Sequence, residues 1–412
     1  MEKREHNILI NTCFGHFMSH FNMLVFPAIV LPLTKHLNME MAGVLGISFW
    51  MYLLFGCTAL PWGMIADRRG GRILMRVYYT GAGLSGLAAA LWIDSVLGLT
   101  IALAALGFFS GIYHPTGLGL ISKEIRRVSV GMGINGMFGN LGLATAPLLT
   151  GVINWFWGPK LAYLFLGSMN LFGLLLMAIF PISVTGHSRE AEKEKTNGLL
   201  GAFVVLLAAM MLRGLAYRAA TVILPTYFEL KNQAFVMWLS GLVQGELTQN
   251  LVATSVTSLI FVIGMLGQYT GGRFAERFDP RFGYLIFFGI TALPGVLMAF
   301  YGNWILIGLA LLYFFFLLGM QPIENTLVAK YTPRRFHHSA FGTKFVLTFG
   351  VGALAVKIVA AIETSYYIEA VFIFIGAISV LAIGIILALI FKTQTHQEDQ
   401  PVVSRKYIEK VT

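Results

Sequence analysis

The chain has 412 residues, of which 57% are hydrophobic and only 12% charged, and its mean hydropathy is +0.75. Soluble domains carry about a quarter charged residues, so this composition excludes an ordinary soluble protein. Repeated apolar runs of about 20 residues instead predict helices that cross a bilayer. We therefore expect an all-α membrane protein.

Twelve spans are predicted from the apolar runs, and a polar stretch divides them into two sets of six. The spans are expected near 8–34, 41–66, 73–93, 97–122, 131–153, 160–182, 200–228, 251–271, 282–301, 304–329, 339–361 and 366–391. The predicted domains are a first six-helix bundle (1–182), a cytoplasmic linker (183–198), a second six-helix bundle (199–391) and a cytoplasmic tail (392–412).

The net charge of +10 comes mainly from basic residues in the loops, and it does not indicate a nucleic-acid-binding surface. Of the 29 Lys and Arg residues, 22 lie at the termini and in or beside the even-numbered loops, and only Lys35, Lys160 and Lys231 lie in the opposite loops. Basic loops stay on the cytoplasmic side of a membrane. We therefore expect both termini in the cytoplasm of a bacterium, a multi-pass protein of its inner membrane, and no nucleic-acid partner.

The two halves repeat each other. "GMIADRRGGR" (Gly63–Arg72) aligns without a gap to "GRFAERFDPR" (Gly272–Arg281), and further matches place His20 on Arg218 and His114 on Gln321. Internal repeats with a substrate site between them near the midplane are common in transporters.

These motifs resemble the major facilitator superfamily, whose signature loop lies between helices 2 and 3. "FMSHFNMLVFPAIVLPL" and "GIYHPTGLGLI" are similar to its fosmidomycin-resistance-type branch, which has a His in helix 1 and a His-Pro in helix 4. That branch often has an acidic residue soon after the helix 1 His, whereas this chain continues Phe21-Asn22-Met23. The resemblance implies a two-lobed transporter in which helices 1, 4, 7 and 10 line the cavity.

Charged residues inside the spans mark a wet or functional interior, because a charge in lipid is costly. The cations are Arg213, Arg218, Lys344 and Lys357, and the clearest acid is Glu324. The two arginines point about 140° apart on one helix. We expect Arg218 to face the cavity, and Arg213 to face a neighbouring helix, a wet crevice or Glu324. Both arginines could instead be structural, and either lysine could reach towards a helix end.

A guanidinium is a permanently charged donor fork that suits carboxylate or phosphate. Since the cations outnumber the carboxylates, we expect an anionic substrate bound by Arg218. The other expected members of the substrate site are His20, His114, Gln321, Arg213 and Tyr217.

Histidine can load and release a proton near physiological pH. His20 and His114, together with Glu324, are therefore candidates for proton coupling. His16, one turn from His20, is expected to serve packing. Glu324 could equally be a salt bridge that holds its helix.

The repeated loop is a candidate gate. Asp67, with Arg68 and Arg72, is expected to clamp one conformational state, and Glu276 and Arg277 are its counterparts in the second half. The alternative is a solvated basic loop that serves only topology.

The function predicted from the sequence is secondary active transport of a small anionic solute, coupled to protons or to a counter-anion. Proton-coupled drug efflux is the second possibility, and a non-transporting membrane sensor or scaffold the third. No enzyme activity or cofactor is expected, because no nucleotide-binding loop follows a strand. No metal site is expected either, because the two cysteines, Cys13 and Cys57, lie inside apolar helices. The expected partners are the small-molecule substrate and membrane lipid, and the expected state is a monomer.

Overall fold

The computed structural model describes residues 2–126, 128–183, 200–243, 247–332 and 337–398. Within these ranges the chain is helical and contains no strand. The predicted linker, apart from Ser183, lies outside the described residues, as does the tail beyond Glu398.

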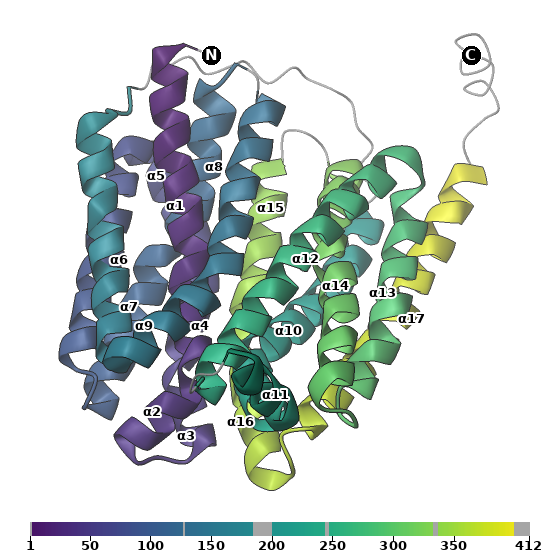
Figure 1. Ribbon diagram of the computed structural model, residues 1–412. Coiled ribbons are helices and arrows are strands. Elements are labelled where there is room, and N and C mark those ends of the chain that lie inside the picture. The colour runs from purple at the N-terminus through teal and green to yellow at the C-terminus, as the bar shows by residue number, and fades with distance from the viewer. Residues whose placement is uncertain (1, 127, 184–199, 244–246, 333–336, 399–412) are drawn as a thin grey trace.

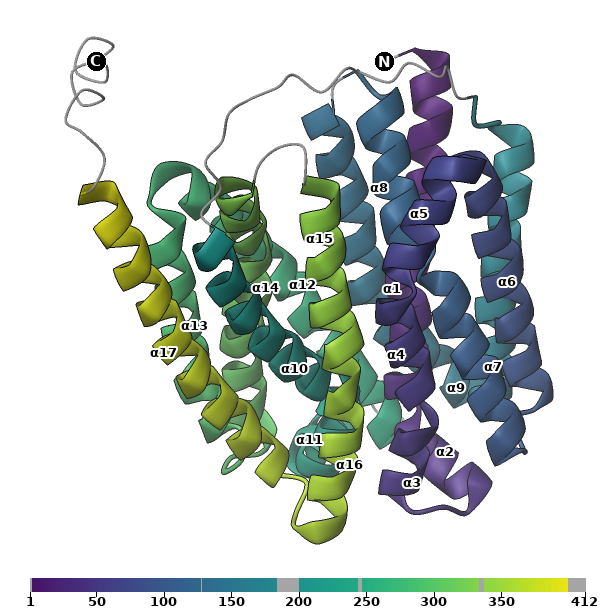
Figure 2. The same cartoon turned by 180° about the vertical axis from the view of Figure 1, so that it is seen from behind.

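The helices form two lobes that stand side by side, as Figures 1 and 2 show from opposite sides. The N-terminal lobe consists of α1 (Lys3–Ala28), α2 (Val30–Leu37), α3 (Met41–Ile47), α4 (Phe49–Cys57), α5 (Ala59–Arg69), α6 (Gly71–Leu91), α7 (Val96–Ser110), α8 (Tyr113–Glu124) and α9 (Val128–Ile179). The C-terminal lobe consists of α10 (Leu200–Lys231), α11 (Gln233–Val243), α12 (Gln249–Arg277), α13 (Pro280–Leu297), α14 (Asn303–Tyr331), α15 (His337–Phe345), α16 (Leu354–Ser365) and α17 (Ala370–Glu398). A π-helical turn (Val346–Gly350) and a 3-10 turn (Val351–Ala353) join α15 to α16.

The number of membrane spans is consistent with twelve. Eight helical segments are long and apolar enough to cross a bilayer, and two bent helix pairs raise the number to ten. One of the eight, Gly131–Ile179, has 49 residues and would be about 70 Å long if straight, which is more than twice a bilayer core. It breaks at Gly158, where φ is +79°, and so supplies two spans. With α6 counted, the total reaches twelve.

The bend between α1 and α2 follows from the sequence. The axis turns by 53° between α1 and α2, directly after Pro27. Proline has no backbone N–H, so the carbonyl of Met23, four residues earlier, loses its helical donor. The Tyr52 hydroxyl of α4 donates to that carbonyl at 2.8 Å. The kink thereby fixes the position of a tyrosine ring at the lobe interface.

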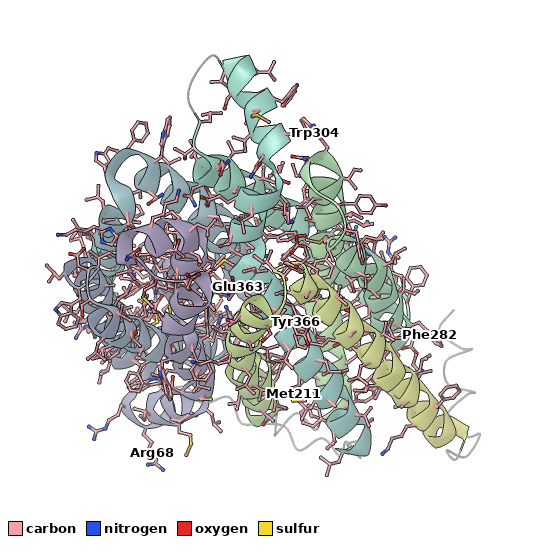
Figure 3. The ribbon with its side chains drawn as sticks, turned by 90° about the horizontal axis from the view of Figure 1, so that it is seen from below. Arg68, Met211, Phe282, Trp304, Glu363 and Tyr366 are labelled. Atoms are coloured by element: carbon pink, nitrogen blue, oxygen red, sulfur yellow. The ribbon has the colours of Figure 1, made fainter. Side chains whose placement is uncertain are left out.

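The two lobes are held together at the far end of the molecule, opposite the end that carries both termini (Figure 1). There the Leu148 N–H of α9 donates to Ser258 Oγ of α12 at 2.8 Å. Asn250 of α12 accepts from Asn154 at 3.1 Å and donates to the Ala28 carbonyl at 2.8 Å. Figure 3, seen from this end, shows the lobes side by side, with α11 projecting beside the labelled Trp304.

Candidate functional site

A small cavity lies at the centre of the bundle, between the lobes. Its open volume is about 40 Å³, room for a few water molecules. Its polar side chains come from both lobes: His20, Asn140, Arg213, Tyr217, Gln268, Gln321, Lys344 and Thr348. Phe345 and Phe349 supply an aromatic wall. This volume is too small for an organic molecule.

Glu324 is the centre of a buried charge network in the C-terminal lobe. Its Oε1 lies 2.8 Å from Arg213 Nε, and its Oε2 lies 3.1 Å from Lys344 Nζ. The Tyr284 hydroxyl donates to Oε1 at 2.8 Å, and Lys344 also donates to Asn325 Oδ1 at 2.7 Å. All three charged side chains are at least nine-tenths buried. Of the orientations that the sequence left open, Arg213 therefore adopts the one towards Glu324, and it lines the cavity as well.

Arg218 lies elsewhere than the sequence analysis expected. It is only 3% exposed, yet it does not line the cavity. Its guanidinium carbon sits 3.8 Å from the centroid of the Tyr52 ring, so a cation of the C-terminal lobe rests on an aromatic ring of the N-terminal lobe. Such a contact is favourable because the face of the ring is electron-rich. Among the described residues, no carboxylate lies within ion-pair distance of Arg218.

Helix α4 of the N-terminal lobe explains why Arg218 lies where it does. Helical periodicity correctly sets the two arginines on different faces, but it does not say which face meets the other lobe. Tyr52, held by the Met23 carbonyl, occupies the position opposite Arg218.

Three histidines of the N-terminal lobe come together beside the cavity. His16 and His20 lie one turn apart on α1, with ring centroids 5.0 Å apart, and His114 of α8 lies 5.2 and 5.5 Å from them. His20 lines the cavity. His114 is 6% exposed and stacks on Phe345 of the other lobe, at 5.3 Å between centroids. His16 packs on Tyr113, as its expected packing role requires, but it is also a member of this cluster.

Gln321 belongs to a chain of amides that crosses between the lobes. Its Oε1 accepts from Gln268 Nε2 at 2.6 Å, and Gln268 in turn accepts from Asn140 of the N-terminal lobe. Tyr217 also lines the cavity, with the guanidinium carbon of Arg213 5.9 Å from its ring centroid. Sequence reasoning missed Asn140, Gln268 and Tyr284, although a polar side chain in an apolar helix was the available signal.

The candidate gate residues lie on the surface at the end bearing the termini. Asp67 pairs with Lys123 of α8 at 2.6 Å, inside its own lobe, and both side chains are more than half exposed. The remaining candidates are also exposed: Arg68, Arg72, Glu276 and Arg277. In the second copy of the loop, the guanidinium of Arg281 is instead buried between Asp279 and Thr393.

The fold and the central polar site define a polytopic helical transporter. The sequence matches the family model of the Major Facilitator Superfamily over residues 12–248 and 232–409. The chain belongs to this superfamily, and it is a multi-pass integral membrane protein whose class transports small molecules rather than catalysing reactions.

Solved transporter structures share the fold over most of their length. The nucleoside transporter NupG gives a TM-score of 0.74 at 14% identity, covering 94% of this chain and 99% of that one. A bacterial homologue of the human lysosomal transporter Spinster, inward-facing and unoccupied, gives 0.72 at 12% identity, covering 94% and 97%. The peptide transporter POT in complex with sulfate gives 0.71 at 16% identity, covering 94% of both chains.

These identities are low enough that the likeness concerns the fold alone. Comparison with curated proteins gave no significant sequence match. The resemblance to the fosmidomycin-resistance-type branch therefore stays a prediction.

Proposed function

We propose that this protein is a secondary active transporter for a small organic anion, moved by alternating access and coupled to protons or to exchange for another anion. We further propose that it is a monomer of a bacterial inner membrane. The distribution of its basic loops supports a topology with both termini in the cytoplasm.

The observation that carries the proposal is an imbalance of buried charge around the cavity. Arg213, Arg218 and Lys344 are all more than nine-tenths buried, whereas Glu324 is the one carboxylate that the described residues place among them. Two formal positive charges therefore lack a counter-charge in a region of low dielectric. Unpaired buried charges are costly, and an anionic ligand would relieve the cost.

The proposed substrate site draws on both lobes. Arg213 and Tyr217 line the cavity with His20 and Gln321, while Arg218 and His114 lie at the lobe interface beside it. We propose that Arg218 leaves the Tyr52 ring and turns to the anion when the lobes separate, because its cation–π contact spans the surfaces that must part.

His20, His114 and Glu324 are the proposed proton carriers. A proton on Glu324 would cancel the charge that holds Arg213 and Lys344, and would free both for an anion. Coupling by His20 and His114 would act from the opposite lobe. Either route links the protonation state to the positive charge available for substrate.

Gating is proposed for the repeated loop. Asp67, Arg68 and Arg72 on one lobe and Glu276 and Arg277 on the other are all exposed at the end bearing the termini. Charged side chains of both signs at the rims of both lobes are suited to pairing across the opening when that end closes.

Export of a drug-like molecule is the second candidate, in keeping with the resemblance to the fosmidomycin-resistance-type branch. It is favoured by the aromatic wall, where Phe345 and Phe349 stack at 5.6 Å between centroids and flank His114. It ranks second because the same wall also suits the apolar part of an organic anion.

The proposal is tested by ligand-induced stabilisation of the purified protein in detergent. Carboxylates, phosphonates and lipophilic cations are screened at acidic and neutral pH. A ligand at 100 times its Kd adds about 2.7 kcal/mol to the stability of the folded state. We expect an organic anion to raise the unfolding temperature of the wild type, and Arg218→Gln to lose most of that rise.

Lys357→Gln is the matched control. Lys357 is also a cation within a predicted span, but it is exposed, lies 5.0 Å from the Phe49 ring centroid and does not line the cavity. It should keep the response to anions. Stabilisation by lipophilic cations alone, equal in wild type and Arg218→Gln, would refute the anion proposal and favour drug export.

A further inference from the structure

The histidine cluster of the N-terminal lobe has the composition and geometry of a metal site. His16, His20 and His114 each offer a ring nitrogen, and these three atoms lie within 4.8 Å of one another. Within the described part of the chain, this is the group of three such ligands that is close enough to hold one ion.

His16 already has the tautomer of a ligand. Its Nδ1 lies 2.9 Å from the backbone carbonyl oxygen of Asn135. A carbonyl only accepts, so Nδ1 carries the proton and Nε2 keeps its lone pair. Metal-bound histidines regularly donate their second ring N–H to such a carbonyl, which fixes the tautomer and the ring.

His114 supplies an independent observation. It is 94% buried, with 6% of its surface exposed, and neither of its ring nitrogens has a hydrogen-bond partner among the described residues. Buried polar atoms are normally satisfied, and an exception calls for a missing ligand or a functional reason. Its ring is held between aromatic side chains, Phe55 and Phe345, so it cannot readily turn to another protein group.

We propose that His16, His20 and His114 bind a divalent transition-metal ion of the Zn²⁺ type, with its fourth coordination position filled by an anion. Three neutral imidazoles plus one exchangeable ligand is a common arrangement for Zn²⁺. Mg²⁺ and Ca²⁺ prefer oxygen ligands and are not expected here.

The geometry needs only a small adjustment. With Zn–N distances of roughly 2.0–2.1 Å, tetrahedral ligands are about 3.4 Å apart. The nitrogens lie within 4.8 Å of one another, so they must approach by at most about 1.4 Å. His16 and His20 lie on successive turns of one helix, and side-chain rotation covers such a movement.

The surrounding charge explains why the fourth ligand is an anion. Arg218 is near enough to act electrostatically on His20, and Arg213 and Lys344 lie across the cavity from it. A divalent ion beside these cations is stable only if negative charge lies close to it. An anion in the fourth coordination position supplies that charge. The metal site does not depend on the proposed transport function, although its anionic ligand would meet the same cations. With the metal bound, His20 and His114 cannot carry protons, so proton coupling would then rest on Glu324 alone.

The experiment uses full-length protein with a tag that contains no histidine, purified in metal-free detergent buffer. Bound metal is measured after gel filtration by elemental analysis, and Co²⁺ is added as a spectroscopic probe, with chloride or acetate as the anion. We expect one Zn²⁺ per chain, a Co²⁺ spectrum typical of tetrahedral nitrogen coordination, and no displacement by excess Mg²⁺.

The variants separate this site from adventitious binding. His114→Asn and His16→Asn should each weaken Zn²⁺ binding at least about 10-fold. His36→Asn is the matched control, because His36 lies on the surface and pairs with Asp94 at 2.7 Å, away from the cluster. Gel-filtration profiles identify any variant that fails to fold. If one of the two cluster variants does not fold, the other one tests the proposal.

Absence of Zn²⁺ from folded wild type, equal binding by the cluster variants and the wild type, or displacement by Mg²⁺ would each overturn the proposal. Anion-induced stabilisation in metal-free buffer is a separate measurement. Failure of the metal site would therefore leave the proposed transport function standing, and failure of the anion response would not affect the metal measurement.

Discussion

The Nε atom of Arg213 lies 2.8 Å from Oε1 of Glu324, and this contact joins α10 to α14 inside the C-terminal lobe. The same carboxylate reaches Lys344 of α15 through its other oxygen and receives the hydroxyl of Tyr284 from α13. One buried carboxylate thus connects four helices. It neutralises one of the two cations beside it, and its position next to the cavity couples the stability of the lobe to the charge offered to a ligand.

Replacement of this carboxylate should destabilise the protein strongly. Glu324→Gln leaves Arg213 and Lys344 buried without a counter-charge, and removal of one partner of a buried pair costs about 3–5 kcal/mol. We expect a clear fall in the unfolding temperature in detergent. Glu276→Gln, the same change at an exposed position, should leave it unchanged. Equal unfolding temperatures for the two variants would show that the network contributes no net stability.

The Tyr52 ring should matter for anion binding through Arg218. Tyr52→Leu removes the aromatic face that Arg218 must leave in order to bind the anion. A desolvated cation–π contact is worth roughly 1–2 kcal/mol, so the apparent anion affinity should rise about 5- to 30-fold. Tyr52→Phe keeps the face but loses the hydrogen bond to the Met23 carbonyl, so it should lower stability and leave the affinity near that of the wild type. Titration of the anion by thermal shift distinguishes the two, and identical affinities in both would contradict a role of the ring.

Asn250 should control how readily the far end of the lobes opens. Asn250→Ala removes hydrogen bonds to Asn154 and to the Ala28 carbonyl across the interface, each worth about 1 kcal/mol, so the open population should rise roughly 30-fold. Spin labels on exposed Asn38 and Tyr367, in a background with both native cysteines replaced, report the separation of the lobes.

Asn232→Ala is the matched control for that experiment. Asn232 is buried, and neither of its side-chain polar atoms has a hydrogen-bond partner among the described residues. The distribution of distances between the two spin labels in Asn232→Ala should match that of the protein without this substitution. A shift of equal size in both variants would attribute the effect to general loosening.

Asp67→Asn should slow transport and leave folding intact. The Asp67–Lys123 pair is largely exposed, and exposed pairs contribute about 0–1 kcal/mol, so the unfolding temperature should barely change. If the loop gates the cavity, solute uptake into proteoliposomes should fall several-fold at equal protein content. Wild-type flux would leave the loop with a topological role only.

Acid should weaken the C-terminal lobe at the Asp279–Arg281 pair. Burial raises the pKa of the Asp279 carboxyl, but the hydrogen bonds from Arg281 outweigh burial, so its pKa lies below the ordinary value. A carboxyl with a lowered folded-state pKa stabilises the fold above its unfolded pKa of about 3.9, and this stability is lost as the pH falls through the folded-state pKa. Asp279→Asn should therefore be less stable than the wild type at pH 6, and the difference should shrink at acidic pH. A constant difference across this range would contradict the assignment.

Much of the architecture could be predicted from the sequence, because membrane spans are determined by local runs of residues. A run of about 20 apolar residues crosses a bilayer wherever it lies, so the helical class and most span positions could be read directly. A polar side chain in such a run is costly in any arrangement, so Arg213, Arg218, Glu324 and His114 stood out before any contact was known.

The partners of those side chains depended on tertiary structure. Helical periodicity gives the angle between Arg213 and Arg218 on their own helix, but the rotation and tilt of that helix against its neighbours decide that Arg213 lines the cavity and Arg218 rests on Tyr52. The metal-type geometry of His16 with His114 likewise joins residues almost 100 positions apart. Such distances are set by the packing of whole helices and by proline kinks, and no local pattern records them.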